Sequence, residues 1–190
     1  MAFIITNVSN PFPNVANESD RDTQYPTPTD GQQVFNKRIN LVQTYNSTFG
    51  LWLDANTRVM TVSQLLNTKR VVYISGSYTV SGIQYPIALY PTSRAANRLI
   101  QGAITQIGNN IVGTRYYVAV AVKGLYYIDY ASGVTVGNYL SARVGSGGNT
   151  GTVWASSGTG VFGHAYENSG ANPNEPNSVL VNIGLTTEIF

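Results

Sequence analysis

Cysteine is absent from the 190-residue chain, and histidine occurs once, as His164. Without cysteine the chain forms no disulfide, carries no thiolate nucleophile and lacks the ligands of most structural zinc sites. A lone histidine between Gly163 and Ala165 in an apolar run is more typical of a packed strand residue than of a metal ligand. The acidic residues also lack the close spacing of a calcium loop. We therefore expect no metal site and no cofactor.

Charged residues are scarce, at 11% of the chain against 43% hydrophobic residues. Solubility must then rest on Asn, Thr, Ser and Gly. Such a surface suits a protein that lives against a partner, because few charges lose their water when the contact forms. A stable extracellular β protein has the same composition, so both hypotheses stay open. The net charge of +2 is too small to predict direct binding of nucleic acid.

The few charges are unevenly placed along the chain. Eight basic residues share a middle stretch whose only acid is Asp129: Arg58, Lys69, Arg70, Arg94, Arg98, Arg115, Lys123 and Arg143. Beyond that stretch the charged residues are all acidic: Glu167, Glu175 and Glu188. These groups either form two faces that meet in an assembly or are scattered, solvated charges.

Long hydrophobic runs are also missing, and no segment approaches the ~18 apolar residues of a membrane helix. The first residues lack the basic and long apolar regions of an export signal. We therefore expect synthesis in the cytoplasm and no membrane partner.

Motifs that carry enzyme chemistry are lacking as well. The chain has no G-x-S-x-G nucleophile motif, and the glycine-rich stretch 145–151 lacks the lysine of a phosphate-binding loop. A triad of His164, Asp129 and a serine, or a carboxylate pair from Asp129, Glu167 and Glu175, would need a fold that brings these residues together. We expect no enzyme and no catalytic residues.

Residues 1–33 differ from the rest in being rich in proline and polar residues. Proline fixes φ and removes a donor, so this segment is predicted to be an extended arm. Its apolar side chains suggest contact with a neighbouring subunit, with a capsid, or with the arm's own domain. The candidate contact residues are Phe3, Ile4, Ile5, Pro11, Phe12 and Pro13.

The remainder, residues 34–190, is predicted to be one β-rich domain. β-branched and aromatic runs predict strands at 71–80 with an interruption at Gly76, at 83–90, at 115–122 and at 125–130, the last two joined by a tight turn at Lys123–Gly124. Apolar residues at three- and four-residue spacing predict one packed α-helix at about 92–107, which ends before Gly108. The predicted fold class is therefore mainly β, as a small β barrel or sandwich with one helix and an extended N-terminal arm.

The aromatic residues add candidate contact positions. Tyrosine occurs 13 times, and adjacent pairs such as Tyr116–Tyr117 place one ring on each face of a strand. Outward rings suit stacking on sugars, so a carbohydrate-binding module stays open. Trp154, which follows the glycine-rich stretch, is expected either in the core or as an exposed anchor on a partner.

The last third of the chain has a distinctive order of motifs. Gly133-Val134-Thr135-Val136-Gly137-Asn138-Tyr139-Leu140 precedes the glycine-rich stretch, and Gly160-Val161-Phe162-Gly163-His164-Ala165 and the apolar run 179–185 follow it. This order resembles the end of the capsid decoration, or cement, proteins of tailed bacteriophages, over roughly the last 65 residues.

The resemblance implies a non-enzymatic virion protein that binds the outer surface of the expanded capsid. Its partner would be the major capsid protein, whose neighbouring subunits it bridges as a homotrimer, and its place of synthesis would be the bacterial host cytoplasm. Residues 1 to about 110 have no counterpart in the motif. A carbohydrate-binding or tail- or fibre-associated β module therefore remains the alternative.

Overall fold

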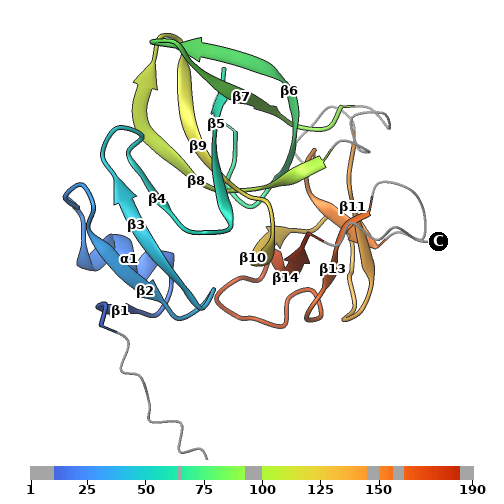
Figure 1. The fold of residues 1–190 in the computed structure, drawn as a ribbon. Coiled ribbons are helices and arrows are strands. Elements are labelled where there is room, and N and C mark those ends of the chain that lie inside the picture. Colours follow the sequence, from blue (N-terminus) through green and yellow to red (C-terminus); the bar gives the residue numbers. More distant parts are fainter. Residues whose placement is uncertain (1–10, 64–65, 93–99, 145–149, 156–160, 185–190) are drawn as a thin grey trace, which may run out of the picture.

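The computed structural model describes residues 11–63, 66–92, 100–144, 150–155 and 161–184, and it is built almost wholly from strands. Two open sheets flank a closed five-stranded barrel (Figure 1). This arrangement confirms the mainly β class and the predicted barrel. One helix, α1, occurs among the described residues.

The N-terminal sheet has the order β1-β2-β3-β4. Its strands are β1 (Asn14–Val15), β2 (Gln33–Asn36), β3 (Leu41–Asn46) and β4 (Leu51–Leu53), and β1 pairs with β2 in parallel. The helix α1 (Glu18–Gln24) follows β1. Its first turn is capped by Asn17, whose side chain accepts the Asp20 N–H at 2.9 Å.

The segment predicted to be an extended arm is therefore helical over Glu18–Gln24 and packed against its own sheet. Val15 and Arg21 are both buried, at 1% and 2% exposure. Local capping by Asn17 outweighs the effect of the surrounding prolines, all of which lie outside the helix. Residues 1–10 lie outside the described residues.

The barrel closes in the order β5-β7-β6-β8-β9. Its strands are β5 (Thr57–Val62), β6 (Val71–Val80), β7 (Ile83–Leu89), β8 (Ile100–Val112) and β9 (Arg115–Ala121). The predicted hairpin of 71–80 and 83–90 is confirmed, and the interruption predicted at Gly76 is a bulge at Ser75, between the pairs Ile74–Ala88 and Gly76–Ile87. Closure leaves the barrel without free edges.

The helix predicted at 92–107 is wrong from residue 100 onward, where β8 begins; residues 93–99 lie outside the described residues. Two register irregularities, between Ile104 and Gln106 and between Ile107 and Ile111, interrupt the two-residue alternation of this strand. The apolar spacing therefore imitates a helical period. The β-branched residues of the run suit a strand, and pairing with β6 and β9 settles the conformation.

The C-terminal sheet has the order β10-β14-β13-β11-β12. Its strands are β10 (Gly124–Asp129), β11 (Tyr139–Ala142), β12 (Val153–Ala155), β13 (Val161–Ala165) and β14 (Ser178–Ile183). β9 belongs to the barrel and β10 to the C-terminal sheet, so the turn at Lys123–Gly124 carries the chain from one to the other. Gly124 has a φ of +94°, which glycine adopts without strain.

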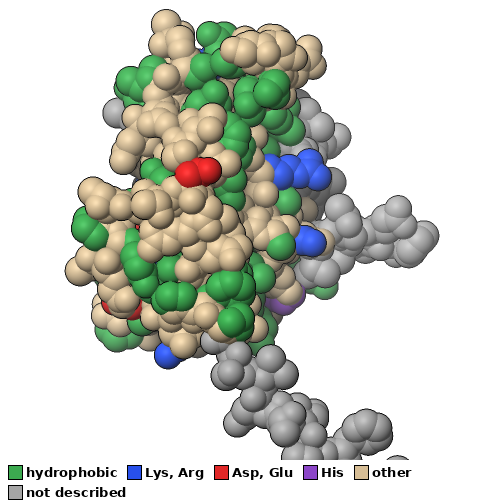
Figure 2. Space-filling view, turned by 60° about the vertical axis from the view of Figure 1, so that its left-hand side comes forward, with side chains coloured by type: hydrophobic (Ala, Val, Ile, Leu, Met, Phe, Trp, Pro, Cys, Tyr) green, Lys and Arg blue, Asp and Glu red, His purple; other side chains and the backbone are tan. Residues whose placement is uncertain are grey.

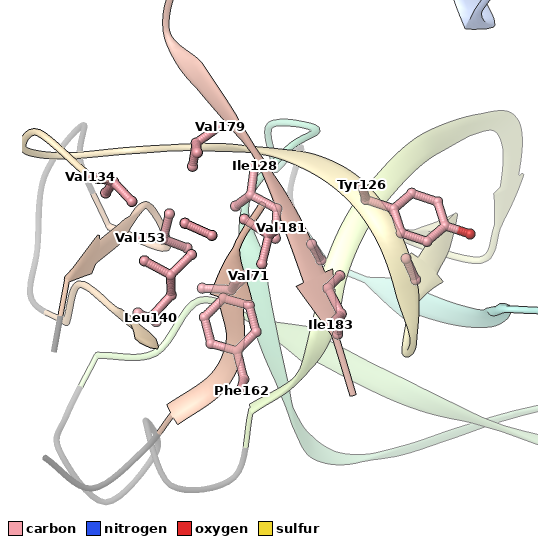
Figure 3. Close-up of a cluster of buried hydrophobic side chains, with 14 of the residues drawn as sticks. Val71, Tyr126, Ile128, Val134, Leu140, Val153, Phe162, Val179, Val181 and Ile183 are labelled. Carbon is pink, nitrogen blue, oxygen red and sulfur yellow. The ribbon is translucent and has the colours of Figure 1, made fainter. Parts of the chain in front are cut away.

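One hydrophobic cluster joins all three units (Figure 3). It contains Ile39 from the loop between β2 and β3, Val71, Ala103 and Ala121 from the barrel, and the inward side chains of the C-terminal sheet. A second cluster fills the barrel around Met60, Val72 and Val118, each with no exposed surface. The sheets are thus held by shared burial of apolar area, worth about 25 cal/mol per Å².

Candidate interaction surfaces

The contact residues predicted near the N-terminus are only partly described. Phe3, Ile4 and Ile5 lie outside the described residues. Pro11 and Pro13 are exposed and Phe12 is half-buried. The Pro13 carbonyl accepts the Phe35 N–H at 2.8 Å, so the arm is already attached to β2 at that residue. Any reaching contact of this arm must therefore precede Pro13.

Trp154 is exposed, with 47% of its surface accessible, so the core alternative is wrong and the anchor alternative stays a prediction. It lies on β12, the edge strand of the C-terminal sheet, directly opposite Ser141 of β11. The Ser141 hydroxyl is buried without a hydrogen-bond partner. The other side of β12 is also paired, since Val153 forms a parallel bridge with Tyr130 and its carbonyl accepts the Ala131 N–H at 2.9 Å.

Strand register places further aromatic residues on the same face as Trp154. Residues directly opposite each other share a face, and so do residues two apart on one strand. Ser141 pairs with Trp154, and Tyr139, two residues before Ser141, pairs with His164 of β13. We call Tyr139, Trp154 and His164, together with Tyr166 in the bend directly after β13, the outer aromatic face.

The outer aromatic face is apolar and accessible. Tyr139 is 47% exposed and Tyr166 is 58% exposed, and Val136, in the turn before β11, is 62% exposed. The intervening residues Leu140, labelled in Figure 3, and Ala165 both belong to the core cluster and are almost fully buried. The alternation therefore separates the packed face from a face on which Tyr139 and Trp154 are exposed, although Ser141 between them is buried.

Uncharged side chains dominate the molecular surface. Figure 2 shows one side of the molecule, on which apolar and neutral polar groups are mixed and Lys, Arg, Asp and Glu are sparse. Few charges would need to lose water on contact with a partner there.

A groove of about 1310 Å³ lies between α1, the N-terminal sheet and the other two sheets. Trp52 in its wall packs with Tyr45 at a ring separation of 5.4 Å and with Tyr25 at 6.3 Å. The Arg21 guanidinium lies 5.2 Å from the Trp52 ring and donates to the Gln43 side chain at 2.9 Å. The aromatic groups of the groove thus already have partners within the chain.

Asp54 is a carboxyl group whose buried environment disfavours the charged form. Burial raises the pKa of Asp54, although the Asn56 N–H and the Tyr126 hydroxyl both donate to Oδ1, at 2.8 and 3.0 Å. Its Oδ2 atom is buried without a partner. Raised carboxyl pKa values are typical of general acids, but Asp54 does not line the groove. We assign it no chemical role.

The triad considered from the sequence is not assembled. His164 pairs with Asn182 of β14, whereas Asp129 pairs with Ser178, four residues away along that strand. The two side chains are thus separated by about 13 Å along β14 and by two strand spacings of about 4.8 Å each. Among the described residues, no three His, Asp or Glu side chains gather to hold a metal ion.

The acids considered as a catalytic pair are each engaged separately. Asp129 accepts from Arg70 Nε at 3.1 Å, and Glu167 accepts the Leu180 N–H at 3.2 Å. Glu175 contacts Lys69 and Arg38. The basic middle and the acidic end of the sequence thus meet inside one chain at Lys69–Glu175, whereas Arg70–Asp129 joins two residues of the middle stretch. The sequence lacked a signal for these two contacts, because each partner lies on a different sheet or loop.

No protein-family model, curated protein or solved structure matches this chain. No helix in the described part of the chain is long and apolar enough to span a membrane.

Proposed function

We propose that this chain is a structural virion protein that binds the outside of an expanded phage capsid and bridges neighbouring major capsid protein subunits. The resemblance of the C-terminal motifs to decoration proteins suggests the role. The outer aromatic face supports it, because Tyr139, Trp154 and Tyr166 all belong to the segment that carries the resemblance. No metal, cofactor or catalytic step is part of the proposal.

The stabilising effect follows from mass action. A protein that binds the assembled lattice but not dispersed capsid subunits shifts the equilibrium toward the assembly. Several weak contacts linked in one oligomer raise the avidity steeply, so the proposed homotrimer would bind more tightly than each subunit alone. Large, rigid rings such as Trp154 and Tyr139 are the residue types that dominate such contacts.

The test is co-sedimentation of the purified protein with expanded heads of its source virus that lack it. We expect saturable binding at a fixed ratio to the major capsid protein. Trp154→Ala is expected to weaken binding at least about tenfold, as for an interface anchor. Ile83→Ala is the matched control, since Ile83 is 57% exposed but lies on the β6–β7 hairpin, away from the C-terminal sheet. Absence of binding by the unchanged protein would overturn the proposal.

The contribution of the arm needs substitutions rather than a deletion of residues 1–30. Such a deletion would also remove α1 and the buried Val15 and Arg21, and would confuse loss of folding with loss of binding. Exchange of Phe3, Ile4 and Ile5 for serine keeps these packed residues. Reduced capsid binding by this variant would support a contact through the arm.

A carbohydrate-binding module of a phage tail or fibre is the second candidate, because exposed Tyr139, Trp154 and Tyr166 also suit stacking on sugar rings. A glycan array separates the two candidates. Glycan binding that is lost in Trp154→Ala, without capsid binding, would favour the carbohydrate function.

A further inference from the structure

Lys69 lies at the junction of two sheets. Its N–H donates to the Ile104 carbonyl of β8 at 2.7 Å, and its own carbonyl accepts the Asp129 N–H of β10 at 2.8 Å. Its φ of +61° is in the left-handed region, which costs a non-glycine residue about 1 kcal/mol or more. The barrel and the C-terminal sheet thus hold Lys69 from both sides and fix where its side chain begins.

The Lys69 amine contacts Glu175, which continues into a chain of charges that reaches the N-terminal sheet. Glu175 Oε1 accepts from Arg38 Nη1 at 2.6 Å, and Arg38 Nη2 pairs with Glu18 of α1. The Arg38 guanidinium also lies 4.9 Å from the Tyr127 ring of β10. Three of the five ion pairs among the described residues belong to this chain of charges.

Glu175 is held in place by its own loop. Its N–H donates to the Asn172 carbonyl at 2.9 Å, and its carbonyl accepts the Ser178 N–H at 3.0 Å. The Asn172 side chain in turn donates to the Tyr127 hydroxyl at 2.7 Å. The Glu175 side chain is only 11% exposed, so its ion pairs are partly shielded from solvent. It is therefore a fixed acceptor for Arg38 from the other sheet.

The Lys69–Glu175 pair also lies where two hollows meet. Both residues line the groove of about 1310 Å³ and a second hollow of about 440 Å³ next to Asp129 and Ser178. Arg38 and Glu18 line the groove but not the second hollow. Loss of the ion pairs would remove the polar connection of α1 to the loop 172–178.

We propose that Glu175 is an acid-sensitive latch: when ionised, it holds the N-terminal sheet and α1 against the barrel and the C-terminal sheet and keeps the groove closed. When Glu175 becomes neutral, Arg38 loses its partner on the C-terminal side, and α1 moves away from the loop 172–178 while Leu51 keeps β4 packed on the barrel. This latch is independent of the proposed capsid function.

The charged groups around Glu175 set the direction of the response. Lys69 precedes β6, and Arg38 lies between β2 and β3; Glu18 reaches Glu175 only through Arg38, and Asp129 is occupied by Arg70 and Ser178. Burial alone would raise the pKa of Glu175, but hydrogen bonds from Lys69 and Arg38 outweigh it and hold the pKa below its usual value. The contribution of the latch is therefore complete above the unfolded-state pKa and lost as the pH falls through the folded-state pKa.

The test measures the distance between the two sheets in the full chain. Because the chain has no cysteine, Ser19→Cys on α1 and Ser132→Cys after β10 provide two exposed positions for spin labels. In the otherwise unchanged protein at neutral pH we expect one short, narrow distance distribution. Glu175→Gln is expected to add a longer distance population at neutral pH. In the protein with Glu175, the same population should appear only on acidification.

Glu167→Gln is the matched control, because Glu167 accepts a backbone N–H and contacts no cation among the described ion pairs. It should leave the distribution unchanged. If Glu175→Gln impairs folding, the distance distribution of the protein with Glu175, measured during acidification, still tests the latch. An unchanged distribution on acidification, or in a folded Glu175→Gln protein, would overturn the latch.

Discussion

The backbone of Gly102 in β8 lies directly against the carbonyl oxygen of Ala121 in β9. A Cβ atom at Gly102 would stand 1.8 Å from that oxygen, which is backbone and has no rotamer to move aside. The barrel therefore closes at this point only because residue 102 has no side chain.

Gly102→Ala is expected to destabilise the chain by about 3 kcal/mol or more, because the added methyl forces β8 and β9 apart. Urea unfolding followed by the fluorescence of the buried Trp52 measures the loss. Gly133→Ala is the control, since nothing lies within 4 Å of a Cβ built there. Equal effects of the two substitutions would contradict the close approach.

Leu140→Ala and Tyr139→Ala test the two faces of β11. Leu140 is fully buried in the shared core, so its truncation should cost about 2–5 kcal/mol. Tyr139 is 47% exposed, and its truncation should cost about 1 kcal/mol or less. The reverse order in chemical unfolding would mean that the outer aromatic face is covered.

Asp54 predicts an unusual pH dependence. Burial raises the pKa of Asp54 above its value in the unfolded chain, so the folded chain binds more protons and loses stability as the pH rises through the interval between the two values. Asp54→Asn should therefore be more stable than the unchanged protein at neutral pH, and the difference should vanish below the ordinary pKa of aspartate. Urea unfolding at neutral pH and at a pH below the ordinary pKa of aspartate measures this difference in stability.

Asp30→Asn is the control, because its expected effect on stability at neutral pH is opposite to that of Asp54→Asn. The Ser47 N–H donates to the Asp30 carboxylate at 2.8 Å and lowers the pKa of Asp30. Neutralisation of Asp30 should therefore reduce stability at neutral pH. If both substitutions change stability in the same direction, the buried environment of Asp54 is not the cause.

The β6–β7 turn offers a stabilising substitution. Ser81 and Gly82 have φ values of 49° and 82°, the left-handed pair required by a two-residue type I′ turn. Asparagine tolerates this region better than serine, so Ser81→Asn should raise the unfolding free energy by about 0.5 kcal/mol. Ser77→Asn, on β6 of the same hairpin, should bring no gain, because asparagine is disfavoured in strands.

The sequence by itself determined the β class, the hairpin at 71–89 and the strands predicted at 115–122 and 125–130, because β-branched runs and turn residues act locally. It also contained the signal for α1: Asn17 stands before Glu18 and Asp20, an N-cap followed by acids in the first turn. The four nearby prolines at 11, 13, 26 and 28 drew the prediction toward an extended segment instead.

Only the tertiary structure decided the conformation of 100–112, the separation of β9 from β10 into different sheets, and the chain of charges from Glu18 to Lys69. Bulges in β8 hid its strand period, and barrel closure against β9 required glycine at 102. Glu175 meets Arg38 across 137 residues of sequence. Such contacts depend on how the sheets pack, and the spacing of residues along the chain carries no record of that packing.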